Sequence, residues 1–215
     1  MAFRTELRCL SPYAGASYIE YATQKAVDHV YDSMVVFPWW VKKVRRDLAG
    51  NALRLCSTVG HPWGHQRTEV KLREAEVALR DGATELEVTL NLMALRDQQA
   101  GWVKPELARL SQGLHDREAF MTVALDHKQM TSEEIELALA LCVATGVDRV
   151  TTFQAFTTAE EVTAWLHSLR QQAGEALDLK LNVTPRLFEQ RASLLVADST
   201  ITFCLDDATD ATDHR

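Results

Sequence analysis

Short apolar runs alternate with longer amphipathic runs along almost the whole chain. The short runs are typical of strands, and the longer ones repeat apolar residues at helical spacing. Strands are expected over Met34–Phe37, Leu53–Val59, Leu86–Leu90, Phe120–Leu125, Arg149–Thr152, Leu177–Leu181 and Thr200–Leu205. Helices are expected over Ile19–Asp32, Glu69–Asp81, Ser132–Thr145 and Ala159–Gln172. Because parallel strands need crossover connections, this alternation predicts a parallel α/β sheet.

The number of strands favours a closed barrel. Seven or eight strand and helix units fit a single-domain (β/α)8 TIM barrel. An open doubly wound sheet is the alternative, although the sequence lacks the glycine-rich nucleotide signatures that would support it. We expect the barrel over residues 1–205 and a short acidic C-terminal tail over residues 206–215.

Charge, cysteine usage and the length of the apolar runs limit which partners and which cellular location are expected. The formal net charge is −7 and the basic residues are spread along the chain, which argues against nucleic acid. The four cysteines lie far apart and are expected to be buried free thiols. No apolar run approaches the length of a membrane span. We therefore expect a cytoplasmic protein that binds a small molecule, with no membrane partner and with a homodimer as a candidate assembly.

The carboxyl ends of the expected strands carry the candidate binding residues, because TIM barrels do their chemistry there. Aromatic, histidine and amide side chains gather at these positions, and we expect the following to bind substrate: Trp39, Trp40, His61, Trp63, His65, Asn91, Gln154 and Asn182. Three of the chain's five tryptophans are in this set, which favours a flat or apolar substrate. The alternative is that these rings only cap the barrel.

The loop after Leu53–Val59 carries the most specific motif. Residues 59–71 read V-G-H-P-W-G-H-Q-R-T-E-V-K, and residues 81–87 read D-G-A-T-E-L-E. They resemble the G-F-P-x-G-x-x-x-T-x-x-K and G-A-x-E-I-D pattern of deoxyribose-phosphate aldolases, and the likeness extends from about Leu10 to Leu205. The resemblance implies a cofactor-free (β/α)8 aldolase that joins acetaldehyde to glyceraldehyde 3-phosphate through a lysine imine.

The residues to which the resemblance assigns the chemistry are only partly retained. The imine-forming lysine falls on Thr151, and a hydroxyl cannot condense with a carbonyl to give an iminium. The family's proton-transfer aspartate falls on Glu87 and its second lysine on Lys180, so a carboxylate and a lysine are kept. The resemblance therefore implies the family's barrel without its first covalent step.

The resemblance also implies a phosphate site built from glycines after the last two strands. Here those segments read V-T-P at 183–185 and T-F-C-L-D-D at 202–207. Without glycine the backbone amides cannot approach a phosphate closely, and the two carboxylates repel it. A non-phosphorylated substrate is expected, with Thr151 among its contacts.

These features predict a divergent aldolase-like enzyme that acts on an aromatic or apolar carbonyl compound. The expected catalytic residues are Lys180, Glu87, Asp126 and Lys128. Lys180 would activate the carbonyl as an ammonium, with Glu87 or Asp126 as the base. An imine on Lys180 or Lys128 is the nearest variant. The reaction would be C–C bond formation or cleavage, cyclisation or isomerisation, with no cofactor and no metal.

Other interpretations remain open. Lys180 and Glu87 would then form a structural ion pair. Residues 126–128 would be a solvated loop, and His61 and His65 would only cap a turn. The chain would then be a catalytically inactive binding protein. A true deoxyribose-phosphate aldolase with a substitute lysine is another alternative. A metal site from His61, His65 and Asp126 is disfavoured, since the two histidines lie on a turn.

Overall fold

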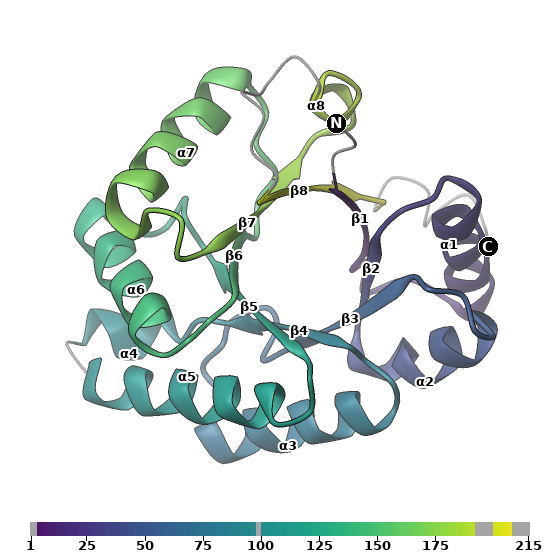
Figure 1. The fold of residues 1–215 in the computed structure, drawn as a ribbon, viewed down its shortest axis with the longest axis horizontal. Coiled ribbons are helices and arrows are strands. Elements are labelled where there is room, and N and C mark those ends of the chain that lie inside the picture. Colours follow the sequence, from purple (N-terminus) through teal and green to yellow (C-terminus); the bar gives the residue numbers. More distant parts are fainter. Residues whose placement is uncertain (1–3, 98–99, 192–199, 208–215) are drawn as a thin grey trace.

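The computed structural model describes residues 4–97, 100–191 and 200–207, and within them eight parallel strands close into a barrel with helices outside it (Figure 1). The strands are β1 (Arg4–Cys9), β2 (Ser33–Val36), β3 (Arg54–Val59), β4 (Glu85–Thr89), β5 (Phe120–Leu125), β6 (Arg149–Thr152), β7 (Asp178–Val183) and β8 (Ile201–Asp206). The helices are α1 (Ala16–Asp28), α2 (Pro38–Asp47), α3 (Thr68–Arg80), α4 (Leu92–Arg96), α5 (Ala100–His115), α6 (Ser132–Ala144), α7 (Ala159–Ala173) and α8 (Pro185–Glu189).

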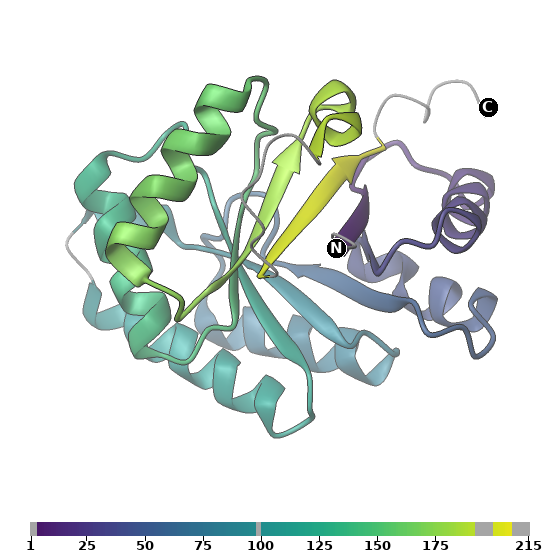
Figure 2. The same cartoon turned by 45° about the horizontal axis from the view of Figure 1, so that its top comes forward.

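Closure of the barrel confirms the predicted fold class. Strand β8 pairs in parallel with β1, in the register from Arg4 opposite Thr202 to Arg8 opposite Asp206. The open-sheet alternative is therefore wrong. Helix α8 follows β7 directly and lies next to β8 at the rim of the barrel (Figure 2). Most of the expected acidic tail, residues 208–215, lies outside the described residues.

Several elements differ from the sequence prediction. Strand β1 was not predicted because it alternates charged and apolar residues instead of forming an apolar run. Helix α2 begins at Pro38, so Trp39 and Trp40 lie in its first turn instead of in a loop, as proline at the first helical position permits. Helices α4, α5 and α8 were not predicted, and α5 contains Pro105, while α1 begins and ends earlier than expected.

The predicted start of α6 is confirmed in detail. Thr131 accepts a hydrogen bond from the Glu134 amide, and the Glu134 side chain accepts one from the Thr131 amide. This capping box satisfies two amides at the helix end. It fixes where the chain leaves the loop that follows β5.

The loop between β3 and α3 is held against the end of β4 by a close backbone approach. Gly64 has a φ of +66°, and a Cβ added there would lie 2.4 Å from the carbonyl oxygen of Leu90. Only glycine fits such a contact in this conformation. The glycine thus holds the loop that carries Trp63 and His65 at the mouth of the barrel.

The apolar core lies between the outer face of the barrel and the helices. Leu7, Leu86 and Leu181 belong to this core, whereas their strand neighbours Glu6, Glu87 and Lys180 do not. Successive side chains of a strand point to opposite faces, so these neighbours point into the barrel. The interior of this barrel is therefore largely polar and charged.

Candidate active site

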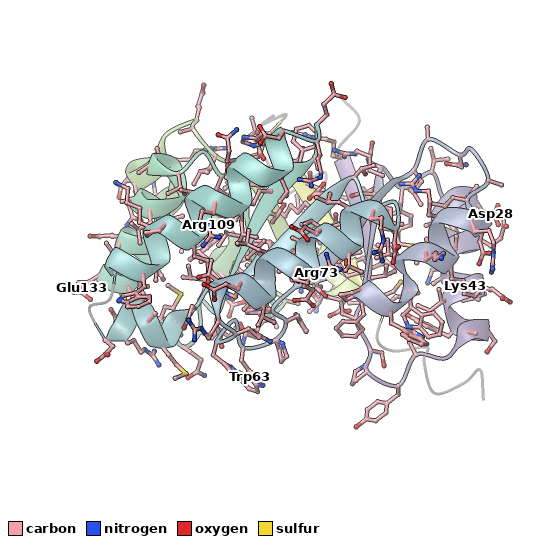
Figure 3. All side chains as sticks on the ribbon, turned by 90° about the horizontal axis from the view of Figure 1, so that it is seen from below. Asp28, Lys43, Trp63, Arg73, Arg109 and Glu133 are labelled. Carbon is pink, nitrogen blue, oxygen red and sulfur yellow. The ribbon has the colours of Figure 1, made fainter. Side chains whose placement is uncertain are left out.

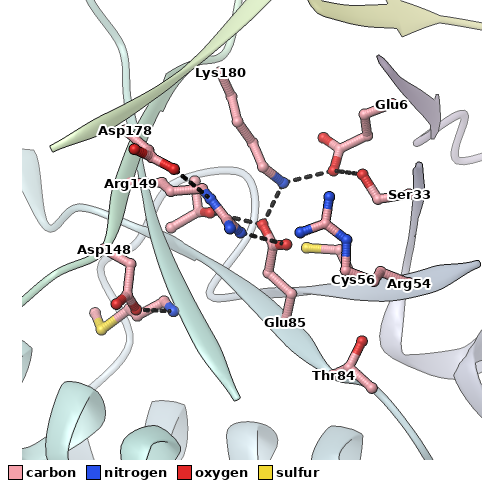
Figure 4. A network of polar contacts seen from close by, with 12 residues as sticks. Glu6, Ser33, Arg54, Cys56, Thr84, Glu85, Asp148, Arg149, Asp178 and Lys180 are labelled. Atoms are coloured by element: carbon pink, nitrogen blue, oxygen red, sulfur yellow. Dashed lines mark hydrogen bonds and ion pairs between the residues drawn. The ribbon is translucent and has the colours of Figure 1, made fainter. Parts of the chain in front are cut away.

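Lys180 is the centre of a buried ion cluster inside the barrel. From β7 its ammonium donates to Glu6 Oε2 of β1 at 2.5 Å, and it forms a second ion pair with Glu85 of β4 (Figure 4). The three side chains are at most 2% exposed. Glu85 is the first residue of β4, so Lys180 points toward the amino ends of the strands and away from the mouth.

Further donors complete the coordination of the two carboxylates. Glu85 accepts hydrogen bonds from Arg149 Nη1 at 2.8 Å and from Thr122 Oγ1 at 2.9 Å. Glu6 accepts one from Ser33 Oγ at 2.8 Å. Every donor comes from a strand, so the cluster ties strands on opposite sides of the barrel together.

Glu87 pairs with a different cation, Arg8, which also lies 3.9 Å from Glu6 Oε1 at the edge of the Lys180 cluster. Arg8 donates from Nη1 to Glu87 Oε2 at 2.6 Å and from Nη2 to Oε1 at 2.9 Å, which is a two-point guanidinium–carboxylate contact. The interpretation in which Glu87 pairs with Lys180 is therefore wrong. Arg8 pairs with Glu87 because β1, a strand that the sequence pattern did not predict, places its guanidinium inside the barrel.

Electrostatics fix the charge states in this interior. Burial alone would lower the pKa of Lys180, but the carboxylates of Glu6 and Glu85 outweigh it and raise the pKa well above the usual value. Burial alone would raise the pKa of Glu85, but Lys180 and Arg149 lower it to about 2. Arg8 likewise outweighs burial and lowers the pKa of Glu87. Lys180 is thus an ammonium, which has no lone pair with which to form an imine.

These lowered pKa values predict acid sensitivity. A carboxyl whose pKa is lower in the folded than in the unfolded state stabilises the protein above its unfolded pKa, and that stabilisation is lost as the pH falls through the folded pKa. Between about pH 5 and pH 2, protonation of Glu85 should lower the free energy of unfolding by an amount on the order of 3 kcal/mol. Urea denaturation across this range measures it, and a flat profile would contradict the proposed charge states.

A cavity of about 680 Å³ opens above this interior, at the mouth of the barrel. Its lining comes from the ends of β4, β5 and β6, from helix α4, and from the loop after β3: Pro62, Trp63, His65, Thr89, Leu90, Leu92, Met93, Arg96, Asp126, Gln129, Met130, Phe153 and Gln154. Most of these side chains are apolar or uncharged. Trp63, 68% exposed, lies at the edge of the molecule in Figure 3.

Asp126 is the one carboxylate among the described residues that line this cavity. Gln154 Nε2 donates to Asp126 Oδ1 at 2.8 Å, and Gln154 Oε1 is buried without a partner. The hydrogen bond orients the carboxylate and leaves its second oxygen for a ligand. Asp126 and Gln154 are thus predicted site residues that the structure brings together.

Histidine and phenylalanine rings lie between the buried ion cluster and the mouth cavity. His61 contacts Phe37 and Phe153, with ring centroids 5.4 and 5.5 Å apart. Burial lowers the pKa of His61. Asn182 donates from Nδ2 to the carbonyl oxygen of Phe153 at 3.0 Å and so fixes this ring's backbone. His61 and Asn182 therefore contact Phe153, which lines the mouth cavity.

Several predicted residues lie elsewhere. Trp39 is 82% exposed and stacks edge-on with Trp40 on α2. Asn91 caps α4 and lines a neighbouring cavity of about 590 Å³, which shares His65 and Met93 with the mouth cavity. Lys128 lines a third cavity, next to α6 and α7. Trp39, Trp40, Asn91 and Lys128 are thus not brought together with Asp126.

The charges that surround Lys180 and Glu87 were not predicted from the sequence. Glu6, Arg8 and Glu85 alternate with apolar residues along β1 and β4, and such alternation is the signal that could have placed them on one face. Lys71 of the sequence motif is also buried: its Nζ donates to the Thr89 carbonyl oxygen at 2.9 Å and to Glu106 at 2.7 Å. It supports the end of β4.

The fold and the position of the cavity define a (β/α)8-barrel enzyme with its candidate site at the carboxyl ends of the strands. Two deoxyribose-phosphate aldolases are similar to it. That of Brevibacillus brevis is 30% identical over 191 residues, which cover 89% of this chain and 86% of that protein. That of Thermococcus kodakarensis is 31% identical over 190 residues, covering 87% and 85%. The chain belongs to the deoxyribose-phosphate aldolase family and is a lyase-like enzyme.

Solved structures share the fold. The tetrameric deoxyribose phosphate aldolase from Aeropyrum pernix has a TM-score of 0.78 at 23% identity, covering 97% of this chain and 86% of that one. No family model matches the chain. Within residues 4–97, 100–191 and 200–207, no helix has the length and apolar character needed to cross a bilayer. In the same residues, no three His, Cys, Asp or Glu side chains are grouped to hold a metal ion.

Proposed function

We propose that the chain is an aldolase-family lyase that cleaves or forms a β-hydroxy carbonyl compound by acid–base catalysis, without a lysine imine. The main support is the position of Lys180, whose ammonium is enclosed by Glu6 and Glu85 below the cavity. Thr151 occupies the position to which the family resemblance assigns the imine-forming lysine. Catalysis then depends on the groups that line the mouth cavity.

Asp126 is the proposed base. It removes the proton of the substrate's β-hydroxyl, the bond between the α and β carbons breaks, and the electron pair moves onto the carbonyl as an enolate. The protonated Asp126 returns its proton to the α carbon, which regenerates the carboxylate. Gln154 holds Asp126 in place through its 2.8 Å hydrogen bond. Atoms and protons balance, and no cofactor is consumed.

The lining of the cavity supports a non-phosphorylated, aromatic or apolar substrate. Trp63, Met93, Met130 and Phe153 supply large apolar surfaces. At the end of β8, Asp206 and Asp207 stand where the family resemblance implies a glycine-rich phosphate segment. Two carboxyl groups in this position disfavour a phosphate.

The test uses the aldol adduct of benzaldehyde and acetone, which carries no phosphate. We expect the protein to release benzaldehyde, measured by its ultraviolet absorbance, and borohydride added during turnover to leave no lysine adduct in the mass spectrum. A trapped adduct on any lysine would overturn the imine-free mechanism. Acetaldehyde release from deoxyribose phosphate would instead identify a true deoxyribose-phosphate aldolase. Ligand binding without turnover would identify an inactive binding protein.

The proposed partner is a small molecule, and the proposed assembly is a homodimer. The net charge of −7 disfavours nucleic acid. The relative from Aeropyrum pernix is described as a tetramer. Light scattering at several protein concentrations distinguishes a dimer from a monomer or a tetramer.

A further inference from the structure

Four polar side chains at the top of the barrel interior have atoms without hydrogen-bond partners. They are the hydroxyls of Thr58, Thr89 and Thr151 and the Oδ1 atom of Asn182, on β3, β4, β6 and β7. Each residue is at most 2% exposed. Buried polar groups are normally paired, because leaving them unpaired costs free energy. These atoms therefore mark a place where another molecule supplies the partners.

The strand register places two of the hydroxyls in one row. Thr89 is opposite Ala124, and Ala124 is opposite Thr151. All three side chains share the inner face, and the alanine between the threonines contributes only a methyl group. The row thus forms a notch over Ala124 with a hydroxyl on each side.

The width of the notch suits a ligand with two oxygen atoms. The backbones of β4 and β6 are two strand spacings apart, about 10 Å, and both side chains point inward from there. One oxygen atom is too small to accept a hydrogen bond from both hydroxyls across such a span, whereas two oxygens on neighbouring carbons or at a 1,3 spacing fill it. Asn182 donates from Nδ2 to Phe153, which leaves Oδ1 as an acceptor for a ligand hydroxyl.

The notch is continuous with the mouth cavity. Thr89 lines that cavity, and so do Phe153 and Asp126. A ligand can therefore place an oxygenated end in the notch and an apolar end against Trp63. Below the notch, Arg8 and Glu87 pair through both terminal nitrogens of the guanidinium, so their charges offset each other, although Arg8 Nε has no partner.

We propose that Thr89, Thr151 and Asn182 form an inner oxygen-binding subsite that takes the carbonyl and hydroxyl of a β-hydroxy carbonyl ligand. This inference rests on the proposed function and specifies its substrate class. The two threonine hydroxyls donate to the ligand oxygens, and Asn182 Oδ1 accepts a hydrogen bond from the ligand hydroxyl until that proton is transferred to Asp126. A carbonyl held in this way has its developing negative charge stabilised by hydrogen bonds instead of by an imine.

Binding, measured apart from turnover, tests the subsite. The Asp126→Asn protein is titrated with the benzaldehyde–acetone adduct and with benzylacetone, which lacks the hydroxyl, while the intrinsic tryptophan fluorescence is followed. We expect the adduct to bind more tightly than benzylacetone. Adding Thr89→Val or Thr151→Val should weaken binding of the adduct about 3- to 10-fold, as the loss of one hydrogen bond does. Thr23→Val is the matched control, because its hydroxyl bonds to Ile19 within α1.

The outcomes separate the subsite from the proposed function. Each valine variant should melt no lower than its parent, since it removes a buried hydroxyl that has no partner in the protein. Unchanged adduct binding in both valine variants would overturn the subsite, whether or not the protein cleaves the adduct. Weakened binding with no cleavage by the wild-type protein would support the subsite and contradict the lyase.

Discussion

Replacing Lys180 by methionine should lower the free energy of unfolding by about 3–5 kcal/mol, because the carboxylates of Glu6 and Glu85 lose their shared cation while buried. The melting temperature should fall by about 2–4 °C for each kcal/mol. Methionine has a similar length, so a cavity contributes little. Calorimetry or urea denaturation measures the loss. Lys104→Met, at an exposed position of α5, is the control and should change stability by no more than about 0.5 kcal/mol.

A second variant separates the loss of charge from a failure to pack. Lys180→Met combined with Glu6→Gln removes one cation and one carboxylate, while Arg8 still pairs with Glu87 and Arg149 with Glu85. We expect this double variant to be more stable than Lys180→Met alone. If it is no more stable, the ion cluster does not act as described. If Lys180→Met folds with unchanged stability and loses only activity, Lys180 contacts substrate directly.

Replacing Asp126 by asparagine should reduce kcat for the benzaldehyde–acetone adduct about 100- to 10,000-fold, the usual contribution of a general base. Asparagine keeps the oxygen that accepts from Gln154 Nε2, so the geometry is preserved while the base is lost. Asp126 is partly exposed, and we expect little change in melting temperature. Steady-state kinetics with benzaldehyde detection measure the effect.

Glu136→Gln serves as the matched control for Asp126→Asn. Glu136 is an exposed carboxylate of α6 that accepts a hydrogen bond from Gln172, outside the described lining of the mouth cavity. Its replacement should leave KM unchanged and kcat within a factor of about 2, since exposed polar contacts contribute little. Full activity in Asp126→Asn would assign the base to another group.

Much of the fold was predictable because strands and helices that are buried need apolar residues at a regular spacing along the chain. Strands buried on the outer face against helices carry apolar residues, and β2 to β8 were found from them. Strand β1 was missed for a related reason: its inward residues are charged, so it shows no apolar run. Helix α5 was missed although its buried face is apolar, with Val103, Leu107, Leu110 and Leu114 at helical spacing.

The sequence by itself determined the fold class, the family resemblance and the presence of a threonine at position 151. These depend on residue type and spacing along the chain. Which charges meet inside the barrel was decided only by the tertiary structure, because Lys180 and Glu6 are 174 positions apart and are joined by closure of β8 onto β1. The same closure directs Lys180 away from the mouth cavity and leaves Asp126 beside it. Strand register, which no local pattern encodes, thus separates the buried ion cluster from the candidate site.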